Sequence, residues 1–316
     1  MNTPKNAASA PKLPEIKTVA IIGLGALGLL YGEKILDAVG EENLVFPMDS
    51  ERLSRHKNDC YTVNGNPVRF TLVDASEGKP VDLVIVAVKY PAFDEALITM
   101  RPFIDAHTII ISVMNGIITE NLIREAYPDC TVLPCVAVGM DAMREGCALH
   151  YVNYGMFQTG ITDERDRPAL HALTALLSKS GIPFTVEPDI LHAMWRKLMI
   201  NVGINQSTTV FDSSYSEILN TPEKRASFER AMREVMTLSD AEGIHLTEEE
   251  FHAACDLMGT MDPDSYPSMH QDYAAKRPTE VELFAGTVRR LAQKHNISVP
   301  ENDFYYERIR ALEKAY

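Results

Sequence analysis

The sequence has few of the features that stabilise small secreted proteins or membrane proteins. It contains five cysteines and no Cys-x-x-Cys pair, so it indicates neither a disulfide framework nor a zinc site. No apolar run approaches the roughly 20 residues that a membrane-spanning helix requires. Residues 1–16 lack the apolar core of a signal peptide, and we expect them to form a flexible tail. We therefore expect a cytoplasmic protein with reduced, buried thiols and no bound metal.

The sequence also has fewer cationic than acidic residues. The sequence has 30 Lys and Arg against 44 Asp and Glu, which leaves a formal net charge of −14. Such a charge repels nucleic acids and anionic membrane surfaces, so we expect neither as a partner. An anionic ligand would therefore need a local cationic site. The length of 316 residues and the hydrophobic content of 46% are typical of a globular chain with two domains.

Short apolar runs alternate with helical patterns in the first part of the chain. The runs are continuous rather than interleaved with polar residues, as in parallel sheets that are covered on both faces. The pattern predicts an α/β fold with a Rossmann-type doubly wound sheet domain over residues 17–188. Within residues 61–74 it predicts two strands joined by a tight turn at Asn64 and Gly65. The other predicted elements are strands at 18–23, 43–49, 81–89 and 107–115 and a helix at 26–39.

From residue 189 onward the pattern is that of long amphipathic helices. It predicts an all-helical C-terminal domain over residues 189–316, which would bind the substrate and could form a homodimer. Pro278 fits the opening of one of these helices, with Thr279 and Glu280 in its first turn. The predicted helices lie at 190–209, 221–243, 247–257, 279–296 and 301–315.

The sequence "IIGLGALG" places Gly23, Gly25 and Gly28 in the spacing G-x-G-x-x-G, directly after a strand and at the start of a helix. The first glycine permits a tight turn, the second lets the backbone approach a pyrophosphate, and the third lets the helix pack closely on the strand. Because the flanking elements are in place, the motif predicts a dinucleotide site rather than a merely structural turn. The residues expected to line it are Gly23, Leu24, Gly25, Ala26, Leu27 and Gly28.

The choice of dinucleotide depends on the end of the second strand. Asp49 lies 21 positions after Gly28 and would accept hydrogen bonds from a ribose diol, which favours NAD. Arg52, Arg55 and Lys57 follow at once and could hold a 2′-phosphate, although they could also form a solvated helix face. In a chain this acidic, the cluster favours NADP(H) as the cofactor.

The helix predicted at 190–209 carries one sparse polar stripe. Lys197, Asn201 and Asn205 are four residues apart, so each lies only about 40° further around the helix than the last. A stripe exposed to solvent usually mixes Glu, Lys and Arg, whereas this one has a single charge among amides. It therefore indicates the wall of a cleft, with a solvent-exposed stripe as the alternative.

Other polar residues stand where such a cleft would meet the sheet. Lys89 and Asn115 each end a strand, at the edge where α/β sheets bind ligands, although Asn115-Gly116 could also be a plain turn. A further polar group lies in residues 266–286. It includes Ser268, His270, Gln271 and Asp272.

From about Thr18 to Tyr316 the chain resembles the ketopantoate reductase (2-dehydropantoate 2-reductase) family. The resemblance depends on "GLGALG", "VAVK", "MNG", "WRKLMINVGIN", "SMHQD", "RPTEVE" and "PENDFYYERIRALE", which occur in the order of the family. It implies NADPH-dependent reduction of 2-dehydropantoate to D-pantoate, a step of pantothenate and coenzyme A synthesis.

The resemblance also implies roles for individual residues. Lys197 matches the catalytic lysine that protonates the developing alkoxide, and Glu280 matches the acid that binds the hydroxyl of the substrate. Asn115 matches the asparagine near the nicotinamide and the substrate. Among the remaining matches, Asn201 and Asn205 contact the substrate, Ser268 receives its carboxylate, and Lys89 lies beside the cofactor. Desolvation in a closed cleft would lower the pKa of Lys197 and make it a better acid.

The chain departs from the family pattern at Glu282, Ala285 and Asn296, where Asp, Asn and Gly are common. These changes leave the predicted catalytic residues intact but weaken the inference about the substrate. Alternatives are a reductase of another branched 2-keto acid, an opine-type dehydrogenase, and a non-catalytic NAD(P)-sensing protein. The last would be expected to have lost Lys197 or the amides, and all of them are present.

Overall fold

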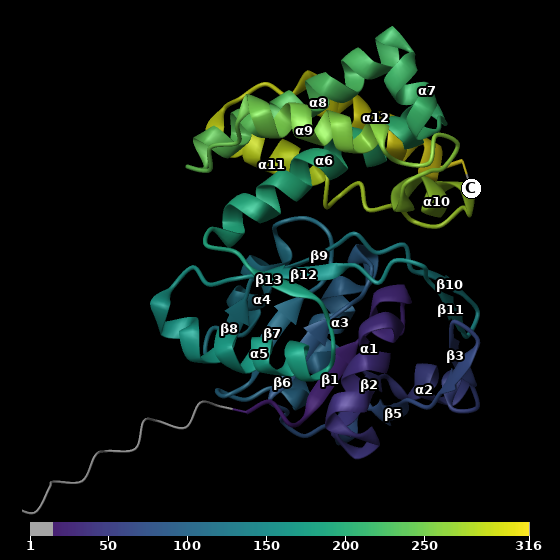
Figure 1. Cartoon of the computed structure of the whole chain (residues 1–316), viewed down its shortest axis with the longest axis vertical. Coiled ribbons are helices and arrows are strands. Elements are labelled where there is room, and N and C mark those ends of the chain that lie inside the picture. Colours follow the sequence, from purple (N-terminus) through teal and green to yellow (C-terminus); the bar gives the residue numbers. More distant parts are fainter. Residues whose placement is uncertain (1–14, 316) are drawn as a thin grey trace, which may run out of the picture.

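The computed structural model describes residues 15–315, and the tail predicted at residues 1–16 lies almost wholly outside them. The described chain forms two layers of different composition, an α/β part below and a helical part above (Figure 1). None of the helices in the described part of the chain combines the length and the apolarity of a membrane span.

A six-stranded sheet forms the centre of the α/β part, and all of its neighbouring strands are parallel. The strand order β5-β2-β1-β6-β7-β8 reverses direction between β1 and β6, so the predicted doubly wound sheet is confirmed. Its strands are β1 (Val19–Ile22), β2 (Leu44–Met48), β5 (Thr71–Asp74), β6 (Leu83–Val86), β7 (Ile109–Ser112) and β8 (Thr131–Leu133).

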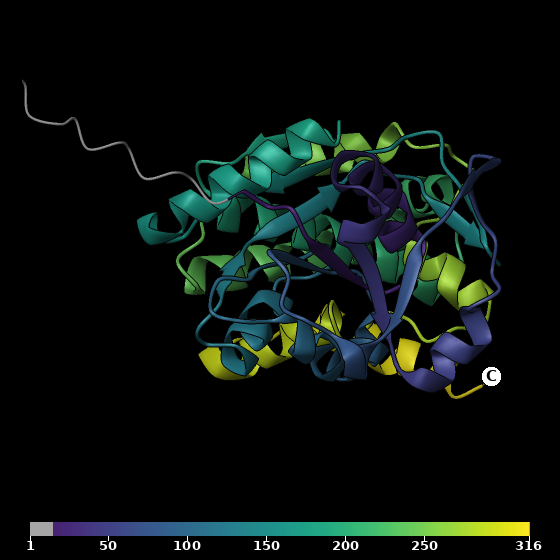
Figure 2. The same cartoon turned by 90° about the horizontal axis from the view of Figure 1, so that it is seen from below.

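Both faces of this sheet are covered by helices, which explains the continuous apolar runs. On β1, Val19 and Ile21 pack with α1 and α5, whereas Ala20 and Ile22 pack with α3 on the opposite face. Figure 2 shows these helices on the two sides of the sheet. They are α1 (Ala26–Val39), α2 (Ser50–His56), α3 (Phe93–Met100), α4 (Thr119–Ala126) and α5 (Arg167–Lys179).

Two small sheets flank the main one. The hairpin at Asn64 and Gly65 is confirmed, and both residues adopt positive φ angles, of 48° and 81°. The run 61–74 nevertheless contains three strands rather than two, because β5 leaves the hairpin and pairs with β2 in the main sheet. The additional strands are β3 (Tyr61–Val63), β4 (Asn66–Val68), β9 (Cys135–Val138), β10 (Met143–Glu145), β11 (Ala148–His150), β12 (Met156–Thr159) and β13 (Phe184–Val186).

The strands end at β13, and all later elements are helices. The central one, α6 (Ile190–Phe211), packs on α8 (Pro222–Ala241), because Gly203 leaves no side chain between α6 and Phe228 or Met232. The other helices are α7 (Tyr215–Asn220), α9 (Glu248–Gly259), α10 (Ser268–Ala274), α11 (Ala285–His295) and α12 (Pro300–Glu313). Neither α7 nor α10 was predicted.

The prediction that a helix begins at residue 279 is wrong. Residues 275–284 form turns, and α11 begins only at Ala285. The Thr279 backbone N–H and hydroxyl both donate to Glu313 Oε1, at 2.8 and 2.6 Å, which holds the segment against α12. The backbone ψ angle of −95° at Phe284 then separates this segment from α11. Glu280 therefore lies on a turn rather than in a helix.

All five cysteines lie within the described residues and are unpaired. Cys135 and Cys255 are buried, as expected, but Cys60 is exposed, so the prediction of buried thiols is wrong at that position.

Candidate active site

The glycine loop joins β1 to α1 at the carboxyl edge of the sheet. Gly23 has a φ of 118°, and a Cβ there would lie 2.5 Å from the carbonyl oxygen of Ala87. A Cβ at Gly28 would lie 1.9 Å from the carbonyl oxygen of Gly23, so α1 packs directly against the turn. Gly25 is the N-cap of α1 and presents the helix N-terminus to the edge. This cradle fits the pyrophosphate of a dinucleotide, because the glycines keep side chains out of the turn and the N-terminus of α1 faces it.

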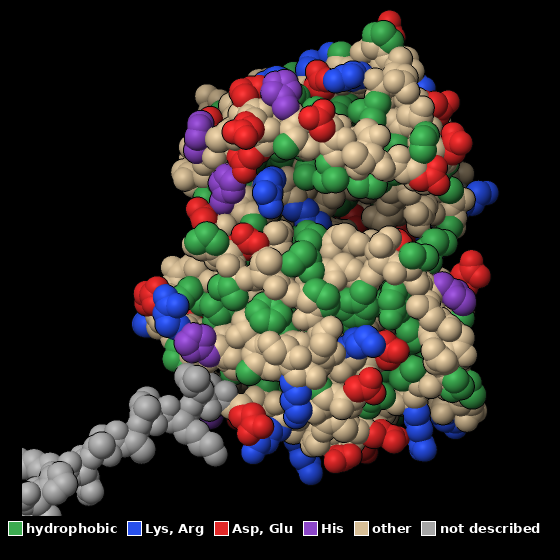
Figure 3. Space-filling view, in the orientation of Figure 1, with side chains coloured by type: hydrophobic (Ala, Val, Ile, Leu, Met, Phe, Trp, Pro, Cys, Tyr) green, Lys and Arg blue, Asp and Glu red, His purple; other side chains and the backbone are tan. Residues whose placement is uncertain are grey.

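Lys89 and Asn115 lie at the same edge of the sheet. Lys89 follows β6, which is hydrogen-bonded to β1, and Asn115 follows β7, which is hydrogen-bonded to β6. Since parallel strands end together, both side chains leave the sheet beside the glycine loop. The space-filling view shows a hollow between the α/β part and the helical part on this face (Figure 3).

Lys197 extends from α6 into this region. Its Nζ donates to Oδ1 of Asn115 at 3.0 Å and to the carbonyl oxygen of Ala137, on β9, at 2.6 Å. Both acceptors are neutral. Burial lowers the pKa of Lys197 from 10.5 to about 8, although nearby acidic groups act in the opposite direction. A lysine with this pKa can release a proton near neutral pH.

Asn115 connects Lys197 to Glu280. The Nδ2 of Asn115 donates to Oε2 of Glu280 at 2.8 Å, while its Oδ1 accepts a hydrogen bond from Lys197 Nζ. These contacts fix the orientation of the amide. Glu280 is only 3% exposed, and it lies on the turn before α11. The three residues predicted as catalytic therefore form one hydrogen-bonded chain, although they come from the loop after β7, from α6 and from the turn before α11.

Lys89 has a different partner set. Its Nζ lies 2.7 Å from Oδ2 of Asp272 on α10 and 4.0 Å from Oε2 of Glu280. Arg277 Nε donates to the other oxygen of Asp272 at 3.0 Å. Partial burial acts to lower the pKa of Lys89, but the charges of Glu280 and Asp272 outweigh it, so the pKa is raised above 10.5.

The predicted stripe on α6 continues toward α10. Asn205 is 5% exposed, donates from Nδ2 to Oδ1 of Asn201 at 3.2 Å, and accepts the backbone N–H of Met269 at 3.2 Å. Asn205 thus connects α6 to the start of α10, where Ser268 is exposed. Asn201 is partly exposed, so its amide is the more accessible of the two.

The residues predicted to select the cofactor surround the end of β2. Asp49 caps α2 by accepting the backbone N–H of Arg52 at 2.8 Å, and this hydrogen bond holds the pKa of its carboxyl below the usual value. The Arg52 side chain lies 3.7 Å from Glu95, and that of Arg55 lies 3.8 Å from Glu51. A crevice beside them is lined by Gly23, Leu24, Met48, Arg52, Val88 and Glu95, among others.

Three groups at the site were not among the sequence-predicted residues. Asp272 belonged to a polar group in the sequence, but nothing there indicated that it binds Lys89. The carbonyl of Ala137 could not have been found, because a backbone acceptor carries no signal in the sequence. The third is Glu120, a buried carboxyl whose charge acts on Lys197.

The residues of this chain match two family models. The model described as "Ketopantoate reductase PanE/ApbA" matches residues 19–163, and the one described as "Ketopantoate reductase PanE/ApbA C terminal" matches residues 189–313. The chain belongs to the ketopantoate reductase family. The predicted membership is confirmed, and the protein is an oxidoreductase of that type.

Similar proteins span nearly the whole chain. The 2-dehydropantoate 2-reductase of Streptococcus pyogenes serotype M6 is 24% identical over 302 residues, which cover 93% of this chain and 97% of that protein. A D-mandelate dehydrogenase solved with NADH and anilino(oxo)acetate has a TM-score of 0.85 at 23% identity, with 94% and 99% of the two chains covered. The dimeric ketopantoate reductase from Staphylococcus aureus has a TM-score of 0.80 at 21% identity, with the same coverage. Family and fold together support a nicotinamide cofactor.

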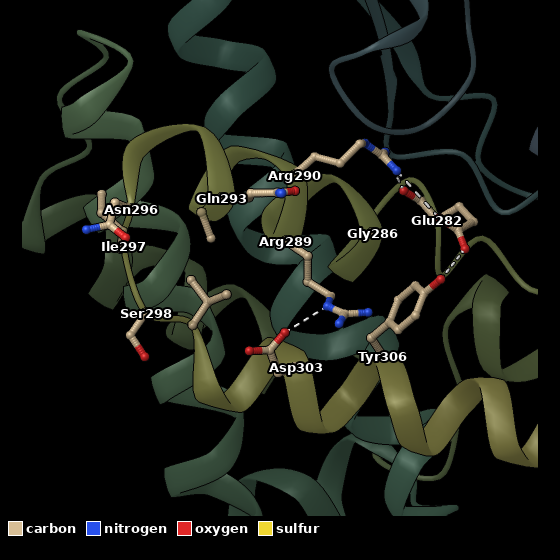
Figure 4. Close-up of a pocket in the computed structure, with 12 residues that line it drawn as sticks. Glu282, Gly286, Arg289, Arg290, Gln293, Asn296, Ile297, Ser298, Asp303 and Tyr306 are labelled. Atoms are coloured by element: carbon tan, nitrogen blue, oxygen red, sulfur yellow. Dashed lines mark hydrogen bonds and ion pairs between the residues drawn. The ribbon is translucent and has the colours of Figure 1, made fainter.

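A groove of about 640 Å³ lies away from this site, between α11 and α12 (Figure 4). It contains two of the three departures from the family pattern. Glu282 accepts the Tyr306 hydroxyl at 2.6 Å and lies 3.5 Å from Arg290, so it points into the groove. Asn296 ends α11 with a φ of 54°, a conformation that Asn tolerates better than most residues and Gly adopts freely.

The third departure, Ala285, is fully buried at the start of α11, and its backbone N–H donates to Oε1 of Gln206 at 2.9 Å. Glu282 and Asn296 therefore have local roles outside the chain of contacts around Lys197. The presence of Glu282 and Asn296, where the family commonly has Asp and Gly, is therefore not evidence for a changed catalytic mechanism.

Proposed function

We propose that the protein reduces the ketone of a 2-keto acid to a hydroxyl group, with Lys197 as the proton donor. The observation that carries this proposal is the placement of the Lys197 ammonium between two neutral oxygens, one of them on Asn115 just after β7, with a pKa of about 8. A bound nicotinamide cofactor would supply the hydride. An ammonium has three N–H groups, of which two are used by Asn115 and Ala137, so one remains for the ketone oxygen.

Each of the surrounding residues has a role in this proposal. The Lys197 ammonium stabilises the negative charge that develops on the ketone oxygen and then transfers a proton from Nζ to it. Asn115 fixes the direction of the ammonium and links it to Glu280, whose carboxylate would accept a hydrogen bond from a hydroxyl group of the substrate. Ser268 and Asn201 would hold the substrate carboxylate. Asn205 would orient both residues, because it donates to Asn201 and accepts the backbone N–H of Met269, the neighbour of Ser268.

The first candidate substrate is 2-dehydropantoate, and its product would be D-pantoate in pantothenate and coenzyme A synthesis. The family match and the relative in Streptococcus pyogenes support this choice. Glu280 also supports it, because 2-dehydropantoate carries a free hydroxyl group. A panel of 2-keto acids should be tested by loss of nicotinamide absorbance at 340 nm. Turnover of 2-dehydropantoate above all others is the expected result, whereas no turnover of any 2-keto acid would refute the proposal.

A second candidate is a 2-keto acid without a hydroxyl group, such as one with an aromatic substituent. The similarity in fold to a D-mandelate dehydrogenase favours it. The panel separates the two candidates when Glu280→Gln is included. A hydroxylated substrate should lose binding in this variant, whereas a substrate without a hydroxyl group should be much less affected. An opine-type reaction would require an added amine, which the same panel can include.

For the hydride donor we propose NADH, with NADPH as the second candidate. The Asp49 carboxylate lies at the end of β2, where it could accept hydrogen bonds from a ribose diol but would repel a 2′-phosphate. Arg52 and Arg55, which favoured NADP(H) in the sequence, each lie near a carboxylate already. We expect Asp49→Asn to reduce the preference for NADH over NADPH roughly tenfold in dissociation constants measured by fluorescence. A larger loss of NADPH than NADH binding in Arg52→Ala would instead support the phosphate role.

We also propose that the protein forms a homodimer and that residues 17–188 and 189–316 are separate domains. The dimeric state of the similar reductase from Staphylococcus aureus supports the first point. The change from strands to helices between β13 and α6 supports the second. Sedimentation equilibrium tests the dimer, and limited proteolysis tests the boundary.

A further inference from the structure

The crevice beside the glycine loop lies where the strand order of the main sheet reverses. Gly23 and Leu24 line it from the turn after β1, Met48 from the end of β2, and Ala96 from α3. In doubly wound folds a dinucleotide binds at such a point, with the ribose of its adenosine half at the end of the second strand. The adenosine half of the proposed cofactor therefore belongs in this crevice.

An ion pair joins two helices across the crevice. Nη1 of Arg52, on α2, lies 3.7 Å from Oε1 of Glu95, on α3, and both residues line the crevice. Their side chains are 39% and 56% exposed, so a ligand that enters from solvent can reach them. The backbone N–H of Arg52 also donates to Oδ1 of Asp49 at 2.8 Å. One carboxylate thus holds the backbone of Arg52, and another holds its guanidinium.

The neighbouring Arg55 is placed differently. Its Nη1 lies 3.8 Å from Oε1 of Glu51, four residues earlier on the same helix, so this second ion pair stays within α2. The first pair instead ties a residue of α2 to the helix that follows β6. Of the two arginines, Arg52 is therefore the one whose position depends on a carboxylate from another part of the chain.

The two forms of the cofactor would affect the first ion pair differently. A ribose diol can donate hydrogen bonds to the carboxylate of Asp49 and leaves the pair of Arg52 and Glu95 intact. A 2′-phosphate needs a cation, and Arg52 can serve it only by leaving Glu95. That exchange would also leave the Glu95 carboxylate without its cation near the incoming phosphate, and like charges repel.

We propose that Glu95 is a positioning residue that sets the choice between NADH and NADPH. It holds the guanidinium of Arg52 against α3 and thereby keeps it from the 2′-phosphate of NADPH. The inference rests on the proposed dinucleotide site and its preference for NADH. It concerns binding alone, so it does not depend on which 2-keto acid is reduced.

The test compares the dissociation constants of NADH and NADPH for the full chain without substrate, measured by the fluorescence of the reduced nicotinamide. Glu95→Gln removes the charge that holds Arg52 and keeps a side chain of similar shape. It should tighten NADPH binding by about threefold to tenfold and change NADH binding by less than about twofold. Asp94→Asn is the matched control, because Asp94 is also an exposed carboxylate in the first turn of α3. It should leave the ratio of the two constants unchanged.

A double variant tests whether Glu95 acts through Arg52. The gain in NADPH binding should disappear when Arg52→Ala is added to Glu95→Gln. Arg52→Ala alone should change NADPH binding by less than about twofold, because Glu95 already holds this side chain. Glu95→Asp restores a carboxylate and should return the ratio toward that of the wild type. An unchanged NADPH constant in Glu95→Gln, or a gain that persists in the double variant, would overturn the proposal.

Kinetics separate this inference from the proposed function. If the protein reduces a 2-keto acid but Glu95→Gln leaves the ratio of the two constants unchanged, only the role of Glu95 fails. If the ratio shifts as expected but no 2-keto acid is reduced, only the proposed function fails.

Discussion

Two lysines near the same buried glutamate have opposite surroundings. Lys89, with Asp272 and Arg277, forms the outer site, where its ammonium faces two carboxylates and its pKa is raised. Lys197, with Asn115 and the Ala137 carbonyl, forms the inner site, where its ammonium faces neutral oxygens and its pKa is lowered to about 8. The outer lysine is therefore a permanent charge, whereas the inner one can exchange a proton.

The difference in partners also indicates different tasks. An ammonium paired with carboxylates is suited to binding and to holding structural elements together, and Lys89 connects the end of β6 to α10. An ammonium held by carbonyl oxygens remains oriented without losing its acidity to an anion in direct contact. The inner site is therefore the better place for proton transfer, although both lysines lie at the edge of the sheet.

The largest effect should come from removing the inner lysine. Lys197→Ala should lower kcat by about 10³-fold, because it removes both the proton and the positive charge at the ketone oxygen. Lys197→Arg keeps the charge but cannot release a proton near neutral pH, so it should remain strongly impaired. Steady-state kinetics measure the loss, and fluorescence titration should show cofactor binding within about threefold of the wild type. Substantial activity in Lys197→Arg would show that charge alone is enough.

A smaller effect is expected at the outer site. Asp272→Asn leaves Lys89 and Arg277 without their shared anion, so the melting temperature should fall by roughly a few degrees. The kcat/KM should fall by about threefold to tenfold, with a smaller change in kcat, because binding rather than proton transfer is affected. Asp256→Asn, an exposed position on α9, serves as the control. A loss of kcat equal to that of Lys197→Ala would abolish the distinction between the two sites.

The smallest effect is expected in the groove between α11 and α12. Asn296 has a positive φ that glycine adopts without strain, so Asn296→Gly should change the free energy of unfolding by less than about 0.5 kcal/mol. The kcat should stay as in the wild type, because this groove is separate from both sites. Urea unfolding and the keto-acid assay test this expectation, and a clear change in kcat would link the groove to the reaction.

Much of the fold could be predicted, because the signals were local. The Gly23–Gly28 spacing identified the β1–α1 turn, and continuous apolar runs identified the parallel strands. The start of α11 could not be predicted, since residues 275–284 are held by a contact between Thr279 and Glu313, 34 positions away in the sequence. Pro278 and its neighbours are typical of a helix start, but such local patterns carry no information about a contact with a distant residue.

In the site, too, the features set by local sequence could be predicted and those set by distant contacts could not. The spacing of Lys197, Asn201 and Asn205 predicted a polar stripe, and the strand ends predicted where Lys89 and Asn115 would lie. Asp272 could not be assigned to Lys89, because 183 residues separate them in the sequence. Glu120 was missed because a glutamate in the first turn of a helix is common and gives no sign of burial. Their roles depend on packing between distant segments.

The most direct test of the central claim is the pH dependence of kcat/KM for reduction of the best 2-keto acid substrate, because kcat/KM follows the titration of the free protein. A proton donor must be protonated, and the pKa of Lys197 is about 8, so kcat/KM should be constant below pH 7 and fall nearly tenfold per unit above pH 9. A kcat/KM that stayed constant up to pH 10 would contradict the account, because Lys197 would then have the pKa of an ordinary exposed lysine or no role in proton transfer.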